Sequence, residues 1–369
     1  MKLFLDNAAT TKLKPEVKDT IINLLDDFYN PSSLYSGGIE VRKIIEDTRK
    51  NVAKFINAKP ENIYFTSSGS ASNTLAIKGY KKPHTIYYSP LLHKSALKCL
   101  DGEITAHKLR VNKCGLIDVS FLDNEIKDIE YPPLVIVEYA NSEIGTIQNI
   151  KEISEIVHKH NGTIYVDCTG SISTIPLDVK KMNIDMCGFS AHKIGSLKGC
   201  GVLYKKPEIE LEPLVYGTQE KGLFGGTENV LGIAALGTAV KSHNYSSISN
   251  NQSTYIYEYI MKNIPDSYLV GTDIRDHRLP HNLYMCFKGV RGESLMILLD
   301  MNGIQVSTGS ACSSGSQQPS STLTEIGMDE EDINSCIRIT FSGDETMDEI
   351  QYFCTTLKNC VNQLRFFST

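Results

Sequence analysis

The sequence predicts an α/β fold, in which a mostly parallel central sheet is flanked by helices and joined to a smaller α+β domain. Through most of the first 250 residues, apolar runs rich in β-branched residues alternate with segments of helical period, which is the pattern of a βαβ series. Several runs are apolar on both faces, as expected of parallel strands that helices cover on both sides. At 369 residues the chain has room for one dominant domain and a smaller one.

The expected elements of the large domain follow one another between turn-like segments. The strands are expected at Asn62–Thr66, His84–Ser89, Pro133–Tyr139, Gly162–Asp167, Met186–Phe189 and Cys200–Tyr204. Helices are expected where apolar residues recur at helical spacing. These positions are Ile150, Ile153 and Val157 in one segment, and Val41, Ile44, Ile45, Val52 and Phe55 in another.

From about Tyr255 the pattern changes to that of a smaller α+β domain. After a long helix come apolar segments at His281–Phe287, Glu293–Gly303 and Cys336–Phe341. A terminal helix then carries one apolar stripe, formed by Met347, Ile350, Phe353, Leu357, Val361 and Leu364. We expect residues 13–254 to form the large domain, and residues 1–12 with 255–369 to form the small one.

A Ser/Gly-rich segment, Ser307–Ser321, interrupts the small domain and has neither a helical nor a strand period. Such a stretch is either a flexible loop or a loop that must approach a ligand closely.

Composition and charge exclude several classes of protein. The 37 Lys and Arg against 43 Asp and Glu give a net charge of −6, so neither nucleic acid nor an anionic membrane is an expected partner. The ten cysteines are too sparse for a disulfide scaffold and none is spaced C-x-x-C, so we expect no metal site. The first residues leave no room for a signal peptide, and no window reaches 18 uncharged apolar residues. We therefore expect a cytoplasmic protein with reduced thiols.

A lysine stands just past the end of an expected strand. Lys193 is preceded by Ser190 and His192 and is followed by glycines, a setting that suits an amine at the edge of a cofactor pocket. A partly desolvated lysine loses its proton more readily and can form an imine with an aldehyde. An ordinary loop lysine is the alternative interpretation.

Asp167 ends a strand that is otherwise apolar. A carboxylate there is costly unless it is paired with a cation, and a pyridinium nitrogen is such a cation, as is the partner in a structural salt bridge. The segment Phe65–Gly79 reads as strand, Gly/Ser turn and helix, an arrangement in which backbone amides cradle a phosphate. By itself this segment predicts only a capped helix, with Ser70 as an acceptable N-cap. No Walker motif is present, and no clean G-x-G-x-x-G follows a strand, which disfavours ATP and dinucleotides.

Ten short motifs are spread along the whole chain: LDNAATT (Leu5–Thr11), NPSS (Asn30–Ser33), VEYANSEIGTIQ (Val137–Gln148), YVD (Tyr165–Asp167), SAHK (Ser190–Lys193), GGTEN (Gly225–Asn229), HNL (His281–Leu283), GESL (Gly292–Leu295), STGSAC (Ser307–Cys312) and IRITF (Ile337–Phe341). In this order they resemble the cysteine desulfurases, pyridoxal-phosphate (PLP) enzymes of the class V aminotransferase group. The resemblance implies the fold type I architecture of PLP enzymes, with a large PLP-binding domain.

The resemblance also implies a role for eleven residues. Lys193 matches the lysine that bonds the cofactor, Asp167 the partner of the pyridine nitrogen, and His93 the histidine that stacks on the ring. The phosphate ligands of the family match Gly69, Ser70, Ser190 and His192. Thr227 matches a residue that reaches the phosphate of the neighbouring subunit, which implies a homodimer with shared active sites.

For the substrate, the resemblance points to L-cysteine. Asn141 and Arg338 match the pair that holds its carboxylate, a task that suits the bidentate fork of arginine. Cys312, among small neighbours on the expected mobile loop at about 307–321, matches the nucleophile that takes the sulfur as a persulfide. The implied reaction converts L-cysteine to L-alanine, and the sulfur passes to an iron-sulfur scaffold or a tRNA-thiolating enzyme.

Four positions depart from the family pattern. Ala71 stands where the family usually has Glu, Gly170 where it has Gln, and Phe224 where it has Arg, while the histidine expected near Ser36 is absent and Tyr35 lies nearby. These changes leave two alternatives open. One is a selenocysteine lyase or another PLP-dependent β-eliminating enzyme, and the other is a degenerate PLP-binding scaffold or partner protein.

Overall fold

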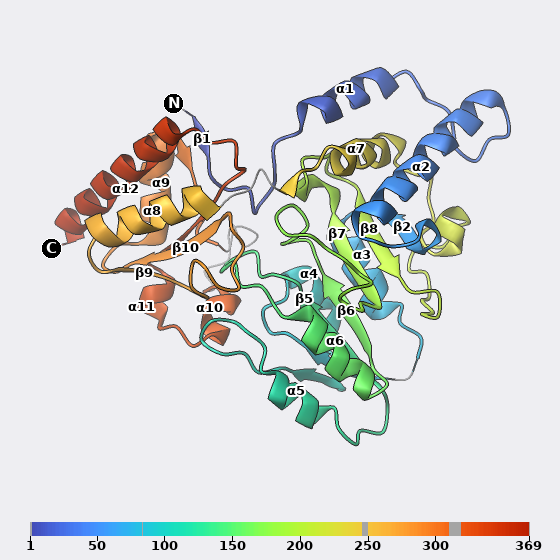
Figure 1. Ribbon diagram of the computed structural model, residues 1–369, viewed down its shortest axis with the longest axis horizontal. Helices are drawn as coiled ribbons and strands as arrows, with labels where there is room; N and C mark the ends of the chain where they lie inside the picture. The colour runs from blue at the N-terminus through green and yellow to red at the C-terminus, as the bar shows by residue number, and fades with distance from the viewer. Residues whose placement is uncertain (1, 83, 246–249, 310–318, 369) are drawn as a thin grey trace.

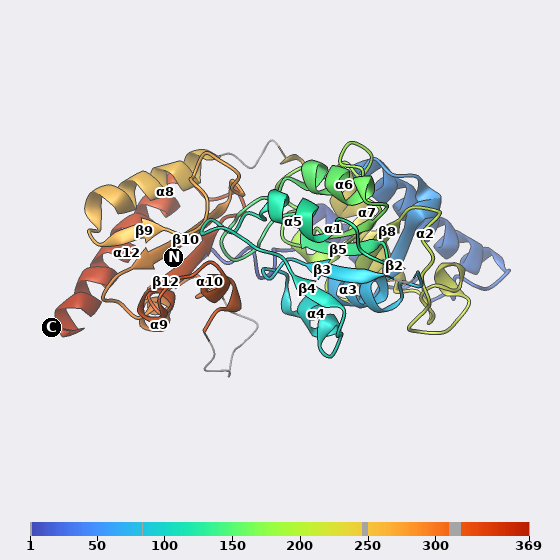
Figure 2. The ribbon, with the colours of Figure 1, turned by 90° about the horizontal axis from the view of Figure 1, so that it is seen from below.

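The protein consists of a large sheet-based body and a smaller α+β body, seen side by side in Figures 1 and 2. The computed structural model describes residues 2–82, 84–245, 250–309 and 319–368. Across this part of the chain, no helix is long and apolar enough to cross a membrane.

The large body is built on a seven-stranded sheet with the order β2-β8-β7-β6-β5-β3-β4. Strand β8 runs antiparallel to both of its neighbours, and the other neighbouring strands run parallel. The strands are β2 (Ile63–Thr66), β3 (Thr85–Tyr88), β4 (Ala106–Lys108), β5 (Pro133–Glu138), β6 (Thr163–Asp167), β7 (Met186–Ser190) and β8 (Gly201–Lys205).

All six strands predicted in this body are present, and their ends agree with the prediction to within one residue. This agreement reflects burial, since every residue of β5 and β6 is buried. The sequence did not predict β4, because its residues Ala106–Lys108 are polar or small and mostly exposed at the sheet edge. The α/β fold class with a mostly parallel sheet is confirmed.

Helices cover the sheet on both faces (Figures 1 and 2). In α6 the predicted stripe of Ile150, Ile153 and Val157 is buried, and in α2 the buried residues include Val41 and Ile45, as the periodicity predicted. The helices of this body are α1 (Pro15–Leu24), α2 (Ser36–Phe55), α3 (Gly69–Lys78), α4 (Lys94–Leu97), α5 (Val119–Glu125), α6 (Ile150–Lys159) and α7 (Val230–Lys241), with 3-10 turns η1 (Pro60–Asn62), η2 (Lys98–Leu100), η3 (Ala191–Lys193) and η4 (Gln219–Gly222).

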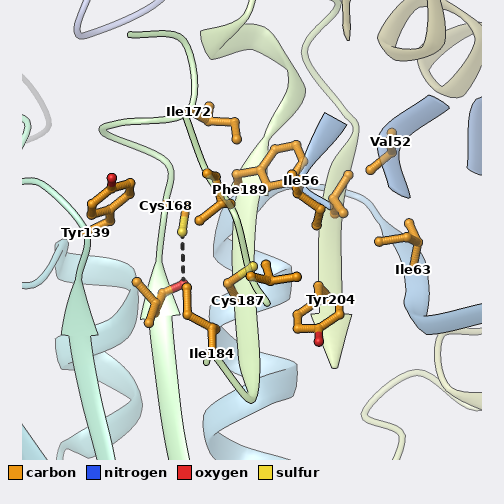
Figure 3. Close-up of a cluster of buried hydrophobic side chains, with 14 of the residues drawn as sticks. Val52, Ile56, Ile63, Tyr139, Cys168, Ile172, Ile184, Cys187, Phe189 and Tyr204 are labelled. Carbon is orange, nitrogen blue, oxygen red and sulfur yellow. Dashed lines mark hydrogen bonds between the residues drawn. The ribbon is translucent and has the colours of Figure 1, made fainter. Parts of the chain in front are cut away.

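The main core of the large body lies between the sheet and one layer of helices. Figure 3 shows part of it, where Val52 and Ile56 from the end of α2 face Phe189 of β7 and Tyr204 of β8. Cys187 lies among these side chains as a small apolar residue. This core holds the central strands rigidly, and their carboxyl ends carry the residues of the candidate site.

The small body has its own core, made by the two ends of the chain together. Leu3 and Leu5 pack with buried residues from 256–361, and β1 pairs in parallel with β11. The other strands form an antiparallel sheet with the order β12-β10-β9. The elements are β1 (Leu3–Phe4), α8 (Asn250–Asn263), β9 (Ser267–Leu269), β10 (Asn282–Phe287), α9 (Gly292–Met301), β11 (Ile304–Gln305), α10 (Ser321–Glu325), α11 (Glu330–Ile333), β12 (Cys336–Thr340) and α12 (Met347–Ser368).

The terminal helix α12 packs against α8 and α9 on one edge of the small body (Figure 1). Its stripe is buried at Ile350, Phe353, Leu357 and Val361. Met347 was predicted to belong to the same stripe, but it is 47% exposed because the first turn of the helix extends beyond the core. The domain boundaries expected after residues 12 and 254 stay a prediction.

Candidate active site

One cavity of about 500 Å³ opens where the carboxyl ends of β5, β6 and β7 meet the start of α3. Residues of the small body complete its wall. Ligands of open parallel sheets bind at such strand ends. Nine of the eleven predicted site residues line the cavity: Gly69, Ser70, His93, Asn141, Asp167, Ser190, His192, Lys193 and Arg338.

Asp167 is held at the end of β6 by two hydrogen bonds. Its Oδ2 accepts from Asn73 Nδ2 at 2.9 Å and its Oδ1 accepts from the backbone N–H of Thr169 at 2.9 Å. Asn73 lies on α3 and in turn accepts a hydrogen bond from Tyr165 Oη. These bonds fix the orientation of the carboxyl group, which is buried at 4% exposure and lines the cavity. Asp167 can therefore present a fixed carboxyl group to a cationic ring.

The N-terminus of α3 also faces the cavity. Ser68 caps the helix by accepting a hydrogen bond from Ala71 N at 3.1 Å, so the expectation that Ser70 is the N-cap is wrong. Ser70 lies two residues further along, in the first turn of the helix, because the chain becomes helical at Gly69. A Cβ on Gly69 would lie 3.1 Å from Thr169 Oγ1 and 3.2 Å from Ser190 Cβ. This glycine thus lets the start of α3 lie close to β7. The backbone N–H groups at the N-terminus of α3 can bind a phosphate.

Lys193 lies at the end of η3, directly after β7. Its Nζ donates hydrogen bonds to the carbonyl oxygens of Ala8 and, at 2.9 Å, of Ala9. The amino-terminal segment thus positions the amine at the cavity wall. The neighbouring His192 is neutral at physiological pH, because burial, Lys193 and Lys198 lower its pKa to about 4. Neutral His192 has one N–H to donate and one nitrogen to accept.

His93 is linked to Asp167 through a chain of polar side chains. His93 Nδ1 lies 2.7 Å from Ser95 Oγ, and Ser95 Oγ accepts from Asn73 Nδ2 at 3.0 Å. Asn73 Nδ2 also donates to Asp167. The imidazole also accepts from the backbone N–H of Ser95 at the start of α4. This chain fixes the position of His93 relative to the carboxylate across the cavity.

Arg338 enters the cavity from β12 of the small body. Its Nη2 donates to Asp6 Oδ1 at 2.8 Å and its Nη1 donates to Ser142 O at 3.0 Å. The buried Nε has no hydrogen-bond partner among the described residues. An unpaired N–H on a buried guanidinium is costly, so Arg338 retains a donor for an anionic ligand.

Both ends of the Asn141 side-chain amide form hydrogen bonds with the backbone. Its Oδ1 accepts the N–H groups of Glu143 and Ile144, both at 2.9 Å, and its Nδ2 donates to Leu91 O. Its side chain therefore shapes the turn that follows β5, and it lines the cavity from that position.

Glu138 is a cavity residue that sequence reasoning missed. It ends β5 beside Asp167 in the sheet register and is 4% exposed, and its Oε2 has no hydrogen-bond partner among the described residues. Burial raises its pKa to about 7, and the charge of Asp167 adds to this effect. The signal was available: an acidic residue ends an apolar strand, as at Asp167. A second carboxyl that can hold a proton near neutral pH thus lies in the site.

Two predicted residues are not among the lining residues. Thr227 is exposed in the loop before α7 and does not line the cavity. Cys312 lies outside the described residues. Gly309 and Ser320, which stand before and after it in the chain, both line the cavity.

The four departures from the family pattern have different structural settings. A Cβ on Gly170 would lie 2.7 Å from Ala140 O, so the backbone here leaves no room for the usual glutamine. Ala71 donates to the helix cap, and Phe224 packs against the apolar core between α3 and the sheet. Tyr35 is exposed at the start of α2. Three of the four changes thus leave the polar network at Asp167 and Lys193 untouched, and Gly170 reshapes the wall beside it.

The sheet order, the lysine after β7 and the aspartate at the end of β6 define an α/β enzyme with a cofactor-sized cavity at the strand ends. The family described as aminotransferase class-V matches residues 3–353. The chain therefore belongs to the class-V aminotransferase family, and the predictions of this family and of an enzyme are confirmed.

Similar proteins place the chain more closely within the family. It is 36% identical to a protein named cysteine desulfurase IscS from Clostridium botulinum, over 100% of this chain and 96% of that protein. The structure of a NifS-like protein from Rickettsia africae matches with a TM-score of 0.90 at 30% identity, covering 98% of this chain and 100% of that one. A structure titled SspA in complex with cysteine matches with a TM-score of 0.80 at 28% identity, covering 94% and 100%. The resemblance to cysteine desulfurases is confirmed.

Proposed function

We propose that the protein is a PLP-dependent cysteine desulfurase, which converts L-cysteine to L-alanine and transfers the sulfur to Cys312. The observation that carries the proposal is the single cavity that brings together a lysine amine, a fixed carboxylate, a helix N-terminus and a buried arginine donor. Relatives with this name span the full chain.

The described residues fit PLP. The fixed carboxylate of Asp167 suits a protonated pyridine nitrogen, and the space kept open by Gly69 at the α3 N-terminus suits a phosphate. Ser70, Ser190 and His192 line the same cavity, and we assign them to the phosphate. Lys193 would hold the aldehyde and His93 would lie against the ring. Bound PLP supplies an electron sink for the substrate carbon.

The chain's own residues bind and orient the substrate. Arg338 offers its unpaired Nε–H to the carboxylate of L-cysteine. Asp6 and Ser142 O hold the rest of the guanidinium in place, and Asn141 holds the adjoining turn. The Nζ of Lys193, held by two backbone carbonyls, is positioned to take and return a proton.

Sulfur transfer to Cys312 balances without a further reactant. The cysteine thiolate attacks the substrate sulfur, the carbon–sulfur bond breaks, and the substrate carbon takes up a proton. L-Cysteine and one enzyme thiol thus become L-alanine and one persulfide. The residues flanking the Cys312 segment line the cavity, which supports delivery of this thiol to the substrate.

The same proposal includes a homodimer that shares its active sites and passes sulfur to an acceptor protein, an iron-sulfur scaffold or a tRNA-thiolating enzyme. Thr227, exposed and away from the cavity of its own chain, would serve the partner's site. Exposed apolar side chains on α1 and α2 and in the loop between them, among them Phe28 and Leu34, would be covered by the second copy. Nine described cysteines are free thiols, as suits the reducing cytoplasm that a persulfide carrier needs.

Mass spectrometry after incubation with L-cysteine tests the proposal. We expect one added sulfur on the peptide that contains Cys312, together with stoichiometric alanine. Cys312→Ser should lose the added sulfur while keeping the yellow colour of bound PLP, and Lys193→Ala should lose the absorption band of the lysine-bound cofactor. Sulfide release from Cys312→Ser at an undiminished rate would instead favour a β-eliminating enzyme or selenocysteine lyase. Cofactor-loaded protein with no turnover would favour a scaffold.

A further inference from the structure

Two thiols face each other across the small antiparallel sheet, away from the proposed chemistry. Cys286 of β10 and Cys336 of β12 are Cα partners in the register. At the neighbouring pair, Phe287 N donates to Ser335 O, and hydrogen-bonded and non-hydrogen-bonded pairs alternate along an antiparallel ladder. The two cysteines therefore occupy a non-hydrogen-bonded pair, the position at which Cα atoms come to about 4.5 Å and side chains are closest.

The two sulfurs share one small polar pocket. Cys336 Sγ lies 3.1 Å from the carbonyl oxygen of Asp332 and Cys286 Sγ lies 3.6 Å from the same oxygen. Both thiols thus lie against one backbone carbonyl oxygen. Both residues are buried, at 0% and 1% exposure, and both are free thiols.

The surroundings make the two thiols unequal. The adjacent Cys336 thiol lowers the pKa of Cys286, and Tyr268 and Lys288 act in the same direction. The adjacent Cys286 thiol and burial raise the pKa of Cys336. Cys286 is thus the more acidic thiol of the pair, and Cys336 lies directly opposite it as a resolving thiol. This is the arrangement of reactive, reversible cysteine sites.

The side chains that touch the pair extend to the surface. Tyr268 Oη donates to Asp332 Oδ2 at 2.7 Å, and Lys288 Nζ lies 3.6 Å from the same oxygen. Tyr268 and Asp332 are partly exposed and Lys288 is exposed. We expect a small oxidant to reach Cys286 on this side of the sheet, when these partly exposed side chains move.

We propose that Cys286 and Cys336 form a redox site, which hydrogen peroxide oxidises to a disulfide between β10 and β12. The Cys286 thiolate attacks a peroxide oxygen, the O–O bond breaks, and Cys286 becomes a sulfenic acid as hydroxide leaves and takes a proton from solvent to form water. The Cys336 sulfur then attacks Cys286 Sγ, the S–O bond breaks, and a second water leaves. The two thiols lose two electrons and the peroxide gains them, and a dithiol reverses the reaction.

The backbone is already suited to this disulfide. Cα atoms in a non-hydrogen-bonded pair fall within the range that disulfides span, about 4.4 to 6.8 Å. The two strands therefore need not separate for the bond to form. The site also lies two residues from Arg338 on β12, which places it on the strand that supplies the cavity's arginine.

Disulfide mapping of the native protein tests the proposal. The protein is treated with hydrogen peroxide, free thiols are alkylated before unfolding, and the unreduced digest is analysed by mass spectrometry. We expect a peptide pair linked through Cys286 and Cys336 that disappears after treatment with dithiothreitol. Linked pairs that contain Cys312 are scored separately. Absence of the 286–336 link, or its appearance only after unfolding, overturns the proposal, and this result needs no variant.

Variants then assign the two roles. In Cys336→Ser, dimedone should trap a sulfenic acid at Cys286, whereas in Cys286→Ser the label at Cys336 should be at least tenfold lower. Equal labelling in the two variants would contradict the assignment of Cys286 as the nucleophile. Cys354→Ser is the matched control, because Cys354 is another buried thiol, on α12 and outside the pair, whose pKa burial raises to about 12. It should keep the linked peptide at the level of the unmodified protein.

Discussion

Replacing Glu138 by glutamine should remove a pH-dependent cost to the stability of the cofactor-free protein. Glu138 is buried at the end of β5, and its pKa is raised to about 7, first by burial and then by Asp167, against hydrogen bonds from Ser89 and Gln148 that lower it. In the unfolded chain the carboxyl has its ordinary pKa of 4.5. The folded protein therefore binds this proton more tightly than the unfolded chain does.

The sign and size follow from that difference. The stability that the protonated Glu138 carboxyl contributes is fully present below pH 4.5. It falls as the pH rises from 4.5 to about 7 and is lost above pH 7, because the folded state must then hold a buried charge. At 1.36 kcal/mol for each tenfold change in proton affinity, a rise from 4.5 to about 7 is worth about 3 kcal/mol. Glu138→Gln lacks the titrating group and keeps its shape. It should exceed the unmodified protein in stability by up to about 3 kcal/mol at pH 8, and show little difference near pH 5.

Thermal unfolding of both proteins between pH 5 and pH 9 measures the effect. We expect the midpoint difference between Glu138→Gln and the unmodified protein to open by a few degrees between pH 5 and pH 7 and to level off above pH 7. Glu40→Gln is the matched control, because Glu40 is exposed on α2, and it should follow the unmodified protein. Parallel pH profiles for Glu138→Gln and the unmodified protein would refute the reasoning.

Three further substitutions test contacts described above. Glu220→Ala should lower the free energy of urea unfolding by about 3–5 kcal/mol, because Glu220 forms a buried bidentate pair with Arg49 at 2.8 and 2.9 Å; a loss below 1 kcal/mol would contradict this. Gly170→Gln should destabilise by about 1–3 kcal/mol, since its Cβ would lie 2.7 Å from Ala140 O, and an unchanged urea midpoint would show that the wall can adjust. Arg338→Lys should raise the KM for L-cysteine by about tenfold through loss of one charge-assisted hydrogen bond, and steady-state kinetics with an unchanged KM would remove Arg338 from carboxylate binding.

Much of the fold could be predicted because buried strands and helices show a periodic pattern of apolar residues along the chain. The six predicted strands of the large body and helices such as α6 bury apolar residues at strand or helix spacing, so their positions follow from local pattern. The edge strand β4 buries little and was missed. The N-cap of α3 was misplaced by two residues, at Ser70 instead of Ser68, because three serines in this turn can each accept a cap hydrogen bond.

Part of the candidate site could likewise be predicted from the sequence, and part could not. Asp167 and Lys193 could be singled out from the sequence because each is a charged residue at the end of an apolar strand. The link from His93 through Ser95 and Asn73 to Asp167 joins segments far apart in the chain, and no local pattern encodes it.

By itself, then, the sequence determined the α/β class, the order of the elements and the residue types available for chemistry, because burial and turn chemistry act over a few neighbouring residues. Only the tertiary structure decided which of these residues share a cavity, that Glu138 lies buried beside Asp167, and that Cys286 faces Cys336. Those relations depend on strand register and on the packing of the small body against the large one, which are set by contacts between distant parts of the chain.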